Sequence, residues 1–474
     1  MVEIIAAVFF IGNVLGLVAL PRVLSERRES YATLSWVLAI VFVPYLGLGL
    51  YALIGSRRIH RTRRVKSRAD ARLSAAEDAA AAGLAAFARP GREPSVGLEG
   101  VLRLADRIAS GPATTGNAVK LLIDGEATFD ALEAAIRAAR HHVHLEYYIF
   151  NADRTGARFR DLLAAKAREG VEVRLLLDGT NRVGEDFFAP LAAAGAHIAV
   201  FMPIVLSLRL GRNPTLRNHR KIVVVDGVTG FTGGVNIGDE YLAGHRHRKR
   251  WRDTHAQIRG PAVHRLQEVF VEDWHFATGV DLVSARYFPA QVAVGDQLVN
   301  VLRSGPDEEW QVIHDILFAA ITQAEHSVVL TTPYFVPGPA FETALTTAAL
   351  RGVEVRLLLP RHADHWLMDY AARAFLPDVM RAGVRVFQYG PGMMHAKTAV
   401  VDGMWATVGS ANMDVRSFRL NFEANLVVHG EAFASELGAA IEADIAEARE
   451  VKPRQPNRRD RILLGVARVL APVL

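Results

Sequence analysis

The sequence predicts an α/β protein with two similar halves in a pseudo-two-fold arrangement, preceded by an N-terminal helical hairpin. The word Gly-Val-Glu-Val-Arg-Leu-Leu-Leu occurs at 170–177 and again at 352–359. A His-x-Lys-x4-Asp pattern occurs at 219–226 and again at 395–402. The chain opens with two long apolar stretches that contain no charged residue. Words repeated in the same order indicate an internal duplication, and the apolar stretches indicate a separate helical segment before it.

The apolar stretches, 4–20 and 31–54, predict two transmembrane helices within residues 1–56. As a helix, the second stretch measures roughly 36 Å at about 1.5 Å per residue, enough to cross a bilayer. Pro44 is expected to kink it. A cleaved signal peptide is disfavoured, because Glu3 stands where a basic start is usual and a second apolar stretch follows. Whether the first stretch crosses the bilayer or lies in it stays open.

A dense basic cluster after the hairpin sets its expected orientation. The cluster consists of Arg57, Arg58, Arg61, Arg63, Arg64, Lys66 and Arg68. Basic residues beside a membrane helix stay on the cytoplasmic side, so the rest of the chain is expected there. The loop between the stretches is also basic, with Arg22, Arg27 and Arg28, and argues mildly for the opposite orientation. The sequence thus predicts a multi-pass protein of the inner (plasma) membrane with a cytoplasmic catalytic body.

The composition narrows the kinds of site that the chain can hold. Its 474 residues include no cysteine, which excludes disulfides and thiolate metal sites. The formal net charge of +5 suits anionic lipid or nucleic acid and does not choose between them.

The body after the hairpin is expected to have four parts. A basic, Ala-rich linker occupies 57–115, the first half 116–290 and the second half 291–450. In each half, apolar strands alternate with amphipathic helical stretches, a pattern typical of βαβ units with helices on the faces of a sheet. The functional site is expected where the halves meet. Residues 451–474 predict a basic amphipathic segment, for which the membrane surface and the body are equally suitable partners.

The two motifs have identical spacing. Their candidate catalytic residues are His219, Lys221, Asp226, His395, Lys397 and Asp402, and each motif is followed by a glycine and then by Asn236 or Asn412. Side chains at i and i+2 of a strand share a face, so each His and Lys are expected to point into one pocket. The Asp has the opposite parity and precedes a turn, so it is better placed to fix the motif than to touch substrate. Four aromatic residues at strand ends, Tyr147, Tyr148, Tyr334 and Phe335, are expected to pack in the core.

This pattern favours phosphodiester transfer without a cofactor or a metal. Two lysines supply positive charge for phosphate oxygens. A neutral imidazole attacks phosphorus, and a second, protonated imidazole donates to the leaving alkoxide. With ordinary pKa values near 6.5, two histidines can hold opposite charge states near neutral pH and then exchange them. The histidines at 245, 247, 255 and 264 lack the carboxylate or cysteine set that would complete a metal site.

Both motifs match the phospholipase D superfamily pattern H-x-K-x4-D-x6-G-(G/S)-x-N, and the wider chain resembles bacterial cardiolipin synthases. The stretches that carry this resemblance are 145–150, 218–221, 233–241, 251–255, 332–337 and 416–423, together with the two N-terminal apolar segments. The resemblance covers nearly the whole chain and implies two tandem phospholipase D-like α/β/α halves. It also implies a two-step reaction through a phosphohistidine. A phosphatidyl group passes from one phosphatidylglycerol to another, and glycerol is released.

The resemblance implies roles for individual residues. His219 is expected to be the nucleophile and His395 the acid and then the base, although the sequence itself does not rank them. Asp253 and Glu423 lie where the superfamily places an acidic residue that orients each imidazole. Ordinary ion pairs with Arg252 and Arg419 are the alternative for these two carboxylates. Asn236 and Asn412 are expected to hold the phosphate or the backbone of the site.

Other functions share this motif pair. The acceptor could instead be water, as in phospholipase D, or serine, as in phosphatidylserine synthase, and the donor could be an ethanolamine lipid. A nuclease is disfavoured because it gains little from a membrane hairpin, so no nucleic-acid partner is expected. A non-catalytic scaffold is disfavoured because no motif position is lost. The expected partners are phosphatidylglycerol and other anionic phospholipids, which the basic run 245–250 is expected to face, and the oligomeric state stays open.

Overall fold

The structure is a computed structural model and falls into two units. The described residues are 2–25, 30–51, 84, 86–88, 98–181, 183–209, 215–242, 250–282, 284–364, 366–452 and 464–465. One unit comprises Met1–Val65 with Met202–Leu216, and the other comprises Lys66–Phe201 with Arg217–Leu474. The predicted basic cluster 57–68, most of the basic run 245–250 and most of the C-terminal segment 451–474 lie outside the described residues.

The first unit is helical. Its helices are α1 (Val2–Ser25), α2 (Ser30–Phe42), α3 (Pro44–Leu50) and α9 (Ile204–Arg209). The second apolar stretch breaks where Pro44 was expected to disturb it, since α2 ends at Phe42 and α3 begins at Pro44. Small residues let these helices approach closely: a Cβ on Gly47 would lie 2.4 Å from the carbonyl oxygen of Ala39.

Within the described part of the chain, no helix combines the length and the apolar character needed to cross a membrane.

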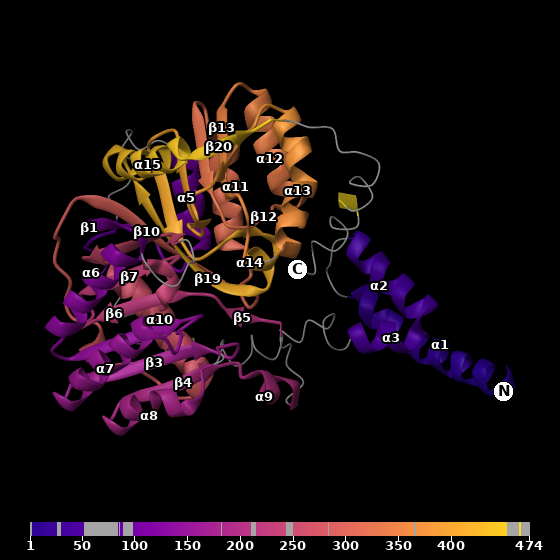
Figure 1. The fold of residues 1–474 in the computed structure, drawn as a ribbon, viewed down its shortest axis with the longest axis horizontal. Coiled ribbons are helices and arrows are strands. Elements are labelled where there is room, and N and C mark those ends of the chain that lie inside the picture. The colour runs from indigo at the N-terminus through magenta and orange to yellow at the C-terminus, as the bar shows by residue number, and fades with distance from the viewer. Residues whose placement is uncertain are drawn as a thin grey trace. The chain divides into compact units, whose positions relative to one another are not determined.

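The second unit is organised around one continuous sheet of 16 strands (Figure 1). In the first half the strand order is β1 (Thr114–Ile123), β9 (Thr254–Arg259), β7 (Thr229–Gly233), β6 (Lys221–Val225), β2 (His142–Tyr147), β3 (Glu172–Asp178) and β4 (His197–Phe201). In the second half it is β10 (Gln297–Ser304), β19 (Asn421–His429), β17 (Trp405–Gly409), β16 (Thr398–Val401), β11 (Ser327–Thr331), β13 (Glu354–Pro360) and β14 (Arg385–Tyr389), with β20 (Ala448–Val451) at the edge. The two orders match strand for strand. The predicted duplication of a mixed α/β half is therefore confirmed.

The halves join at the centre of this sheet. β1 pairs with β10 in the antiparallel sense, as a pseudo-two-fold axis between them requires. Two short parallel pairings also cross between the halves. β5 (Arg217–Asn218) pairs with the start of β19, and β15 (Met393–Met394) pairs with β8 (Trp251–Arg252). Each crossing strand runs directly into a motif histidine, so these pairings decide what the two histidines meet.

Helices cover the sheet in groups. In the first half they are α6 (Asp124–Ala138), α7 (Arg154–Arg168), α8 (Glu185–Ala193) and α10 (Ala262–Thr278), with short helices at Asp239–Tyr241 and Ala285–Tyr287. In the second half they are α11 (Val312–Gln323), α12 (Gly338–Leu350), α13 (Trp366–Arg381), α14 (Val415–Arg419) and α15 (Glu431–Ala446), with β12 (Phe335–Val336) and β18 (Met413–Asp414) forming a small separate pair. α7 packs on β3 and on α8, and α12 packs on β13, α11 and α13 (Figure 1). One more helix, α5 (Glu99–Ile108), lies in the predicted linker and packs on α11 through Val101 and Ala105.

Buried histidines in the first half make the fold sensitive to acid. His142 and His144 on β2 are both 0 % exposed. Burial lowers the pKa of His142 to about 3 and holds the pKa of His144 well below its ordinary value. Below about pH 6.5 the unfolded chain therefore binds protons that the folded chain does not, so stability falls as the pH falls. At pH 4.5, His142 alone is expected to cost about 2–3 kcal/mol relative to pH 7.

Thermal unfolding followed between pH 7 and pH 4.5 checks this expectation. The midpoint should fall with acidification, and His142→Gln should flatten the dependence because glutamine does not titrate. An identical pH dependence in the variant would contradict the assignment to His142.

Candidate active site

The two histidines and two lysines of the motifs converge on one site. His219 and Lys221 lie at the junction of β5 and β6, and His395 and Lys397 lie just before β16. All four are less than a tenth exposed, and Lys221 and Lys397 each perturb the pKa of both imidazoles. Each lysine Nζ also donates to the carbonyl oxygen of the histidine two residues earlier.

Each imidazole pairs with a carboxylate from the opposite half. His219 Nδ1 lies 3.1 Å and 3.0 Å from the two carboxylate oxygens of Glu423, on β19. His395 Nδ1 lies 2.6 Å from Oδ2 of Asp253, which follows β8. The backbone makes the same kind of contact between halves. The His219 N–H donates to the Phe422 carbonyl, and the His395 N–H donates to the Arg252 carbonyl. The site is thus built by reciprocal contacts across the pseudo-two-fold axis.

These contacts decide between the two interpretations of Asp253, which were to orient an imidazole or to pair with Arg252. Arg252 donates to the backbone carbonyl of Asp253 rather than to its carboxylate, and it forms ion pairs with Asp444 at 2.7 Å and with Asp124 at 3.8 Å. The Asp253 side chain faces His395 instead. The Glu423 carboxylate accepts from His219, and also from the Ser410 hydroxyl at 2.5 Å and from the Asn421 amide at 3.2 Å. Both carboxylates therefore lie where they can orient an imidazole, with its Nε2 left for chemistry.

The two half-sites differ at the second position of the Gly-Gly/Gly-Ser pair. Ser410 donates to Glu423, whereas a Cβ on Gly234 would lie 2.1 Å from Oδ1 of Asp253. The shorter Asp253 carboxylate instead accepts from the backbone N–H of Thr254. A glycine at 234 is thus required by the closeness of Asp253, and a serine at 410 adds a donor where there is room.

The two motif aspartates bind backbone N–H groups at the ends of strands that lie far from the imidazoles. Asp226 accepts from the backbone N–H groups of residues 140, 141 and 142 at 2.8–2.9 Å. Asp402 accepts from those of residues 325, 326 and 327 at 2.8–2.9 Å. Both aspartates have positive φ and precede a glycine of positive φ, a sequence that suits this tight hairpin. Asp226 lies five residues beyond Lys221, roughly 16 Å at about 3.3 Å per residue. The aspartates therefore fix the motifs, as their parity predicted, and do not reach the reacting groups.

Replacing Asp402 by alanine is expected to lower stability more than chemistry. Three backbone donors lose a charged acceptor, which costs about 2–4 kcal/mol in total. Denaturant unfolding should show this loss, and Asp402→Asn should show a smaller one because the amide oxygen still accepts. Turnover per folded molecule should stay within about tenfold of the parent protein. A loss below about 0.5 kcal/mol would contradict this account of the carboxylate.

The two motif asparagines behave differently. Asn236 accepts from the Ile149 N–H at 3.3 Å and donates to the Tyr241 hydroxyl at 3.1 Å, so it fixes the backbone at Ile149 and the Tyr241 side chain beside His395. The Asn412 backbone N–H donates to the Ser417 hydroxyl oxygen at 3.2 Å, and the Asn412 side-chain oxygen has no hydrogen-bond partner among the described residues. Asn412 is therefore the better placed of the two to meet a ligand.

Burial dominates the electrostatics of the unliganded site. It lowers the pKa of His219 and of His395 to about 4, against the opposing effect of Glu423 and Asp253. Both imidazoles are therefore neutral at pH 7 before substrate binds. The expectation that they hold opposite charges does not apply to this state, because the neighbouring lysines also disfavour an imidazolium.

The lysines and carboxylates respond to the same burial. Burial lowers the pKa of Lys221 to about 7 and that of Lys397 to about 8. Burial alone would raise the pKa of Glu423 and Asp253, but the facing histidines and lysines hold both below their ordinary values. The site thus combines two carboxylates with two lysines that titrate near neutral pH. An anionic phosphodiester would raise the pKa of both lysines on binding.

Aromatic rings flank both imidazoles. Tyr148 lies against His219 with ring centroids 4.8 Å apart, and Trp251 lies 4.9 Å from His395. The Tyr241 hydroxyl is 3.4 Å from His395 Nδ1. Core packing was the expectation for Tyr148, whereas Trp251 and Tyr241 were not predicted as site residues. Their position just before Asp253 and five residues after Asn236 was the available signal.

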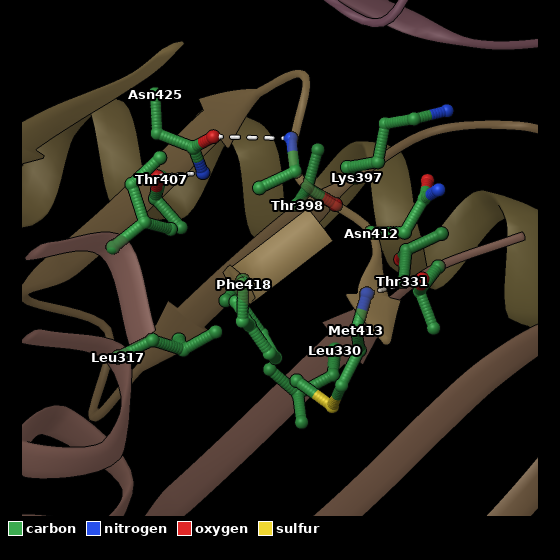
Figure 2. A pocket seen from close by; sticks show the side chains of 14 residues that line it. Leu317, Leu330, Thr331, Lys397, Thr398, Thr407, Asn412, Met413, Phe418 and Asn425 are labelled. Atoms are coloured by element: carbon green, nitrogen blue, oxygen red, sulfur yellow. Dashed lines mark hydrogen bonds between the residues drawn. The ribbon is translucent and has the colours of Figure 1, made fainter. Parts of the chain in front are cut away.

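A small cavity lies beside Lys397 in the second half. Leu317, Leu330, Met413 and Phe418 form its apolar part, and Thr331, Thr398 and Asn412 its polar part. Figure 2 shows the Lys397 ammonium pointing away from the apolar side chains. The side-chain oxygens of the three polar residues have no hydrogen-bond partner within the described part of the chain. The polar part therefore suits a small hydrogen-bonding molecule such as water.

Comparison with known proteins decides the family. The sequence profile described as "Cardiolipin synthase, PLD-like domain" matches residues 132–274 and 317–445. The chain belongs to the cardiolipin synthase family of the phospholipase D superfamily. A second profile, "Phospholipase_D-nuclease N-terminal", matches residues 6–56.

Relatives of the family cover almost the whole chain. The cardiolipin synthase of Geobacillus kaustophilus is 38% identical over 460 residues, which are 95% of this chain and 90% of that protein. The major cardiolipin synthase ClsA of Bacillus subtilis is 35% identical and is covered over 99% of its length by 100% of this chain. The crystal structure of a phosphatidylserine synthase from Haemophilus influenzae superposes with a TM-score of 0.59 at 15% identity, covering 79% of this chain and all of that one. That likeness concerns the fold alone.

Proposed function

We propose that this protein is a cardiolipin synthase that moves a phosphatidyl group from one phosphatidylglycerol to another through a phosphohistidine. The reciprocal pairing of His219 with Glu423 and of His395 with Asp253 is the observation that carries the proposal. It provides two imidazoles whose Nδ1 atoms are occupied and whose Nε2 atoms are left for chemistry at one phosphorus. It also provides one imidazole from each half, as a two-step exchange of roles requires.

In the first step His219 is the nucleophile. Its Nε2 lone pair attacks phosphorus and a phosphorus–nitrogen bond forms. The bond from phosphorus to the oxygen of the head-group glycerol breaks. The neighbouring Glu423 stabilises the positive charge that develops on the imidazole. Lys221 and Lys397 bind the non-bridging oxygens, and the phosphate charge raises the pKa of both lysines and of His395. His395, which is neutral in the unliganded site, takes up a proton from solvent on its Nε2 as the substrate binds. His395 then donates its Nε2 proton to the departing glycerol oxygen.

In the second step the roles reverse. His395, now neutral, takes the proton from the hydroxyl of a second phosphatidylglycerol. That oxygen attacks phosphorus, the bond to His219 breaks, and cardiolipin leaves. His395 returns its proton to solvent as cardiolipin leaves, so no net proton is consumed and the unliganded site is restored.

Residues 1–56 are proposed to anchor the protein in the plasma membrane as a transmembrane hairpin with the catalytic body on the cytoplasmic side. The two uncharged apolar stretches and the match of residues 6–56 to an N-terminal profile of the superfamily support this proposal. The boundaries 57–115, 116–290, 291–450 and 451–474 are proposed for the remaining parts. Anionic phospholipids, and not nucleic acid, are the proposed partners.

A product assay tests the reaction. Full-length protein is mixed with phosphatidylglycerol vesicles without added metal, and lipids and free glycerol are followed over time. Cardiolipin and glycerol should appear in equal amounts. Phosphatidic acid in place of cardiolipin would mean that water is the acceptor. If product forms only when serine or an ethanolamine lipid is supplied, the acceptor or the donor is different.

A further inference from the structure

A buried arginine contacts the backbone of Glu423. Arg220, between the motif His and Lys, is 0 % exposed. Its Nε donates to the Glu423 carbonyl at 3.1 Å, and its guanidinium also binds the Asp273 carboxylate on α10. Asp273 in turn accepts from Asn218, the residue before His219, at 3.2 Å. This ion pair therefore contacts the Glu423 backbone and the side chain of the residue just before His219.

A second buried arginine makes the same kind of contact with Asp253. Arg252 is 5 % exposed and donates to the Asp253 carbonyl. Its guanidinium binds the Asp444 carboxylate on α15 through contacts of 2.8 Å and 2.7 Å. Its own carbonyl accepts the His395 N–H at 2.7 Å. This ion pair touches both members of the His395–Asp253 pair.

The two arginines make the same contact, with the backbone carbonyl of a histidine-facing carboxylate residue, but they do not occupy equivalent positions in the repeat. The position that corresponds to Arg220 in the second motif is Ala396, and the residue that precedes Glu423 is Phe422 rather than an arginine. The two helices that supply the aspartates do occupy equivalent places. α10 follows β9, the strand that begins just after Asp253, and it carries Asp273. α15 follows β19, the strand that contains Glu423, and it carries Asp444. The same contact thus occurs in both half-sites, although the arginines that make it are not at equivalent positions of the duplicated sequence.

The choice of acceptor atom has a chemical consequence. A guanidinium bound to the carboxylate of Glu423 or Asp253 would compete with the imidazole for its charge. Bound to the backbone carbonyl, it fixes the residue while the carboxylate stays available to the histidine. Because a misplacement of about 1 Å can cost on the order of 100-fold in rate, such fixing matters for catalysis.

We propose that the Arg220–Asp273 and Arg252–Asp444 ion pairs are two positioning clamps, one for each imidazole–carboxylate pair. Arg220 acts on His219 through Glu423, and Arg252 acts on His395 through Asp253. The kinetic test of this proposal rests on the phosphatidyl transfer proposed above. A second test, by histidine ¹⁵N resonances of the unliganded protein, does not.

A crossed set of double variants tests the assignment. Arg220→Met should lower the rate of glycerol release by about 10- to 100-fold in the parent protein. In a Glu423→Ala background the same change should matter less than about threefold, because the positioned group is already gone. Arg252→Met should keep its full effect in that background and lose it in Asp253→Ala. The control is Arg174→Met. Arg174 is a buried arginine that pairs with Glu172 at the start of β3 and contacts neither motif histidine, so its replacement is expected to leave activity unchanged.

The outcomes separate positioning from stability. Equal effects of Arg220→Met and Arg252→Met in every background would overturn the proposal, since a purely structural loss does not depend on which carboxylate is present. If the methionine variants do not fold, Asp273→Asn and Asp444→Asn weaken the same clamps from the helix side and must show the same crossed pattern. If the parent protein makes no cardiolipin, the proposed function fails, and histidine ¹⁵N resonances of the unliganded protein decide the clamps instead. Arg220→Met should then shift the His219 signals alone and Arg252→Met the His395 signals alone, and shifts of both or neither would overturn the proposal.

Discussion

His219→Ala is expected to lower cardiolipin formation by at least about 10⁴-fold, because the phosphatidyl group loses the atom that carries it between the two steps. His395→Ala should lose a similar factor, since the leaving glycerol oxygen then departs without a proton. The double variant should be little worse than either single variant, because the two imidazoles act as one unit. Radiolabelled phosphatidylglycerol makes a loss of this size measurable.

His264→Gln is the matched control for both variants. His264 is also buried and bonds the Pro289 carbonyl at 2.8 Å, but it belongs to neither motif. Its replacement should change activity by less than about threefold. If His219→Ala kept more than about a hundredth of the parent activity while folded, the phosphohistidine mechanism would be wrong.

Lys397→Met is expected to lower kcat/KM by about 10²- to 10³-fold, because a buried cation is removed from the phosphate oxygens in the transition state. Lys221→Met should have a comparable effect. In the parent protein kcat/KM reports on the free enzyme, in which His395 must still gain a proton, so it should decline as the pH rises above the His395 pKa of about 4. It should fall more steeply above about pH 7–8 as the lysines also lose their protons. On the acid side it should fall below about pH 4 as His219 becomes protonated and the nucleophile is lost.

The lysine variants also shift the acid side of this profile. Lys397 lowers the pKa of His219, so its removal should raise that pKa and move the acid fall of kcat/KM to higher pH. Arg174→Met again serves as a control that should leave the profile unchanged. A flat profile from pH 5 to 9 in the parent protein, with chemistry limiting the rate, would contradict the assignment of the lysine pKa values.

Much of the fold followed from local pattern. The repeated word at 170–177 and 352–359 marks β3 and β13, which occupy equivalent places in the two halves of the sheet. Asp226 was expected to fix the motif because of its parity and the turn that follows it, and its carboxylate accepts from the backbone N–H groups at the start of β2. Such features depend on the period of a strand and on turn chemistry, both of which a sequence displays directly.

The exchange between halves did not follow from local pattern. Nothing in the spacing says that His219 faces Glu423 and not Asp253, because that choice is made by the β5–β19 and β8–β15 pairings between segments far apart in the chain. The ion pairs of Arg252 and Arg220 were hidden for the same reason. The charge states of the imidazoles also escaped prediction, since burial beside two lysines, rather than residue type, sets their pKa values.

The stereochemical course at phosphorus tests the central claim most directly. Phosphatidylglycerol with a chiral, isotopically labelled phosphate would be converted to cardiolipin, and the configuration at the transferred phosphorus compared with that of the donor. Each in-line displacement inverts phosphorus, so two displacements through His219 predict net retention. Net inversion would mean that the second lipid attacks the first directly, without a phosphohistidine, and would contradict the account.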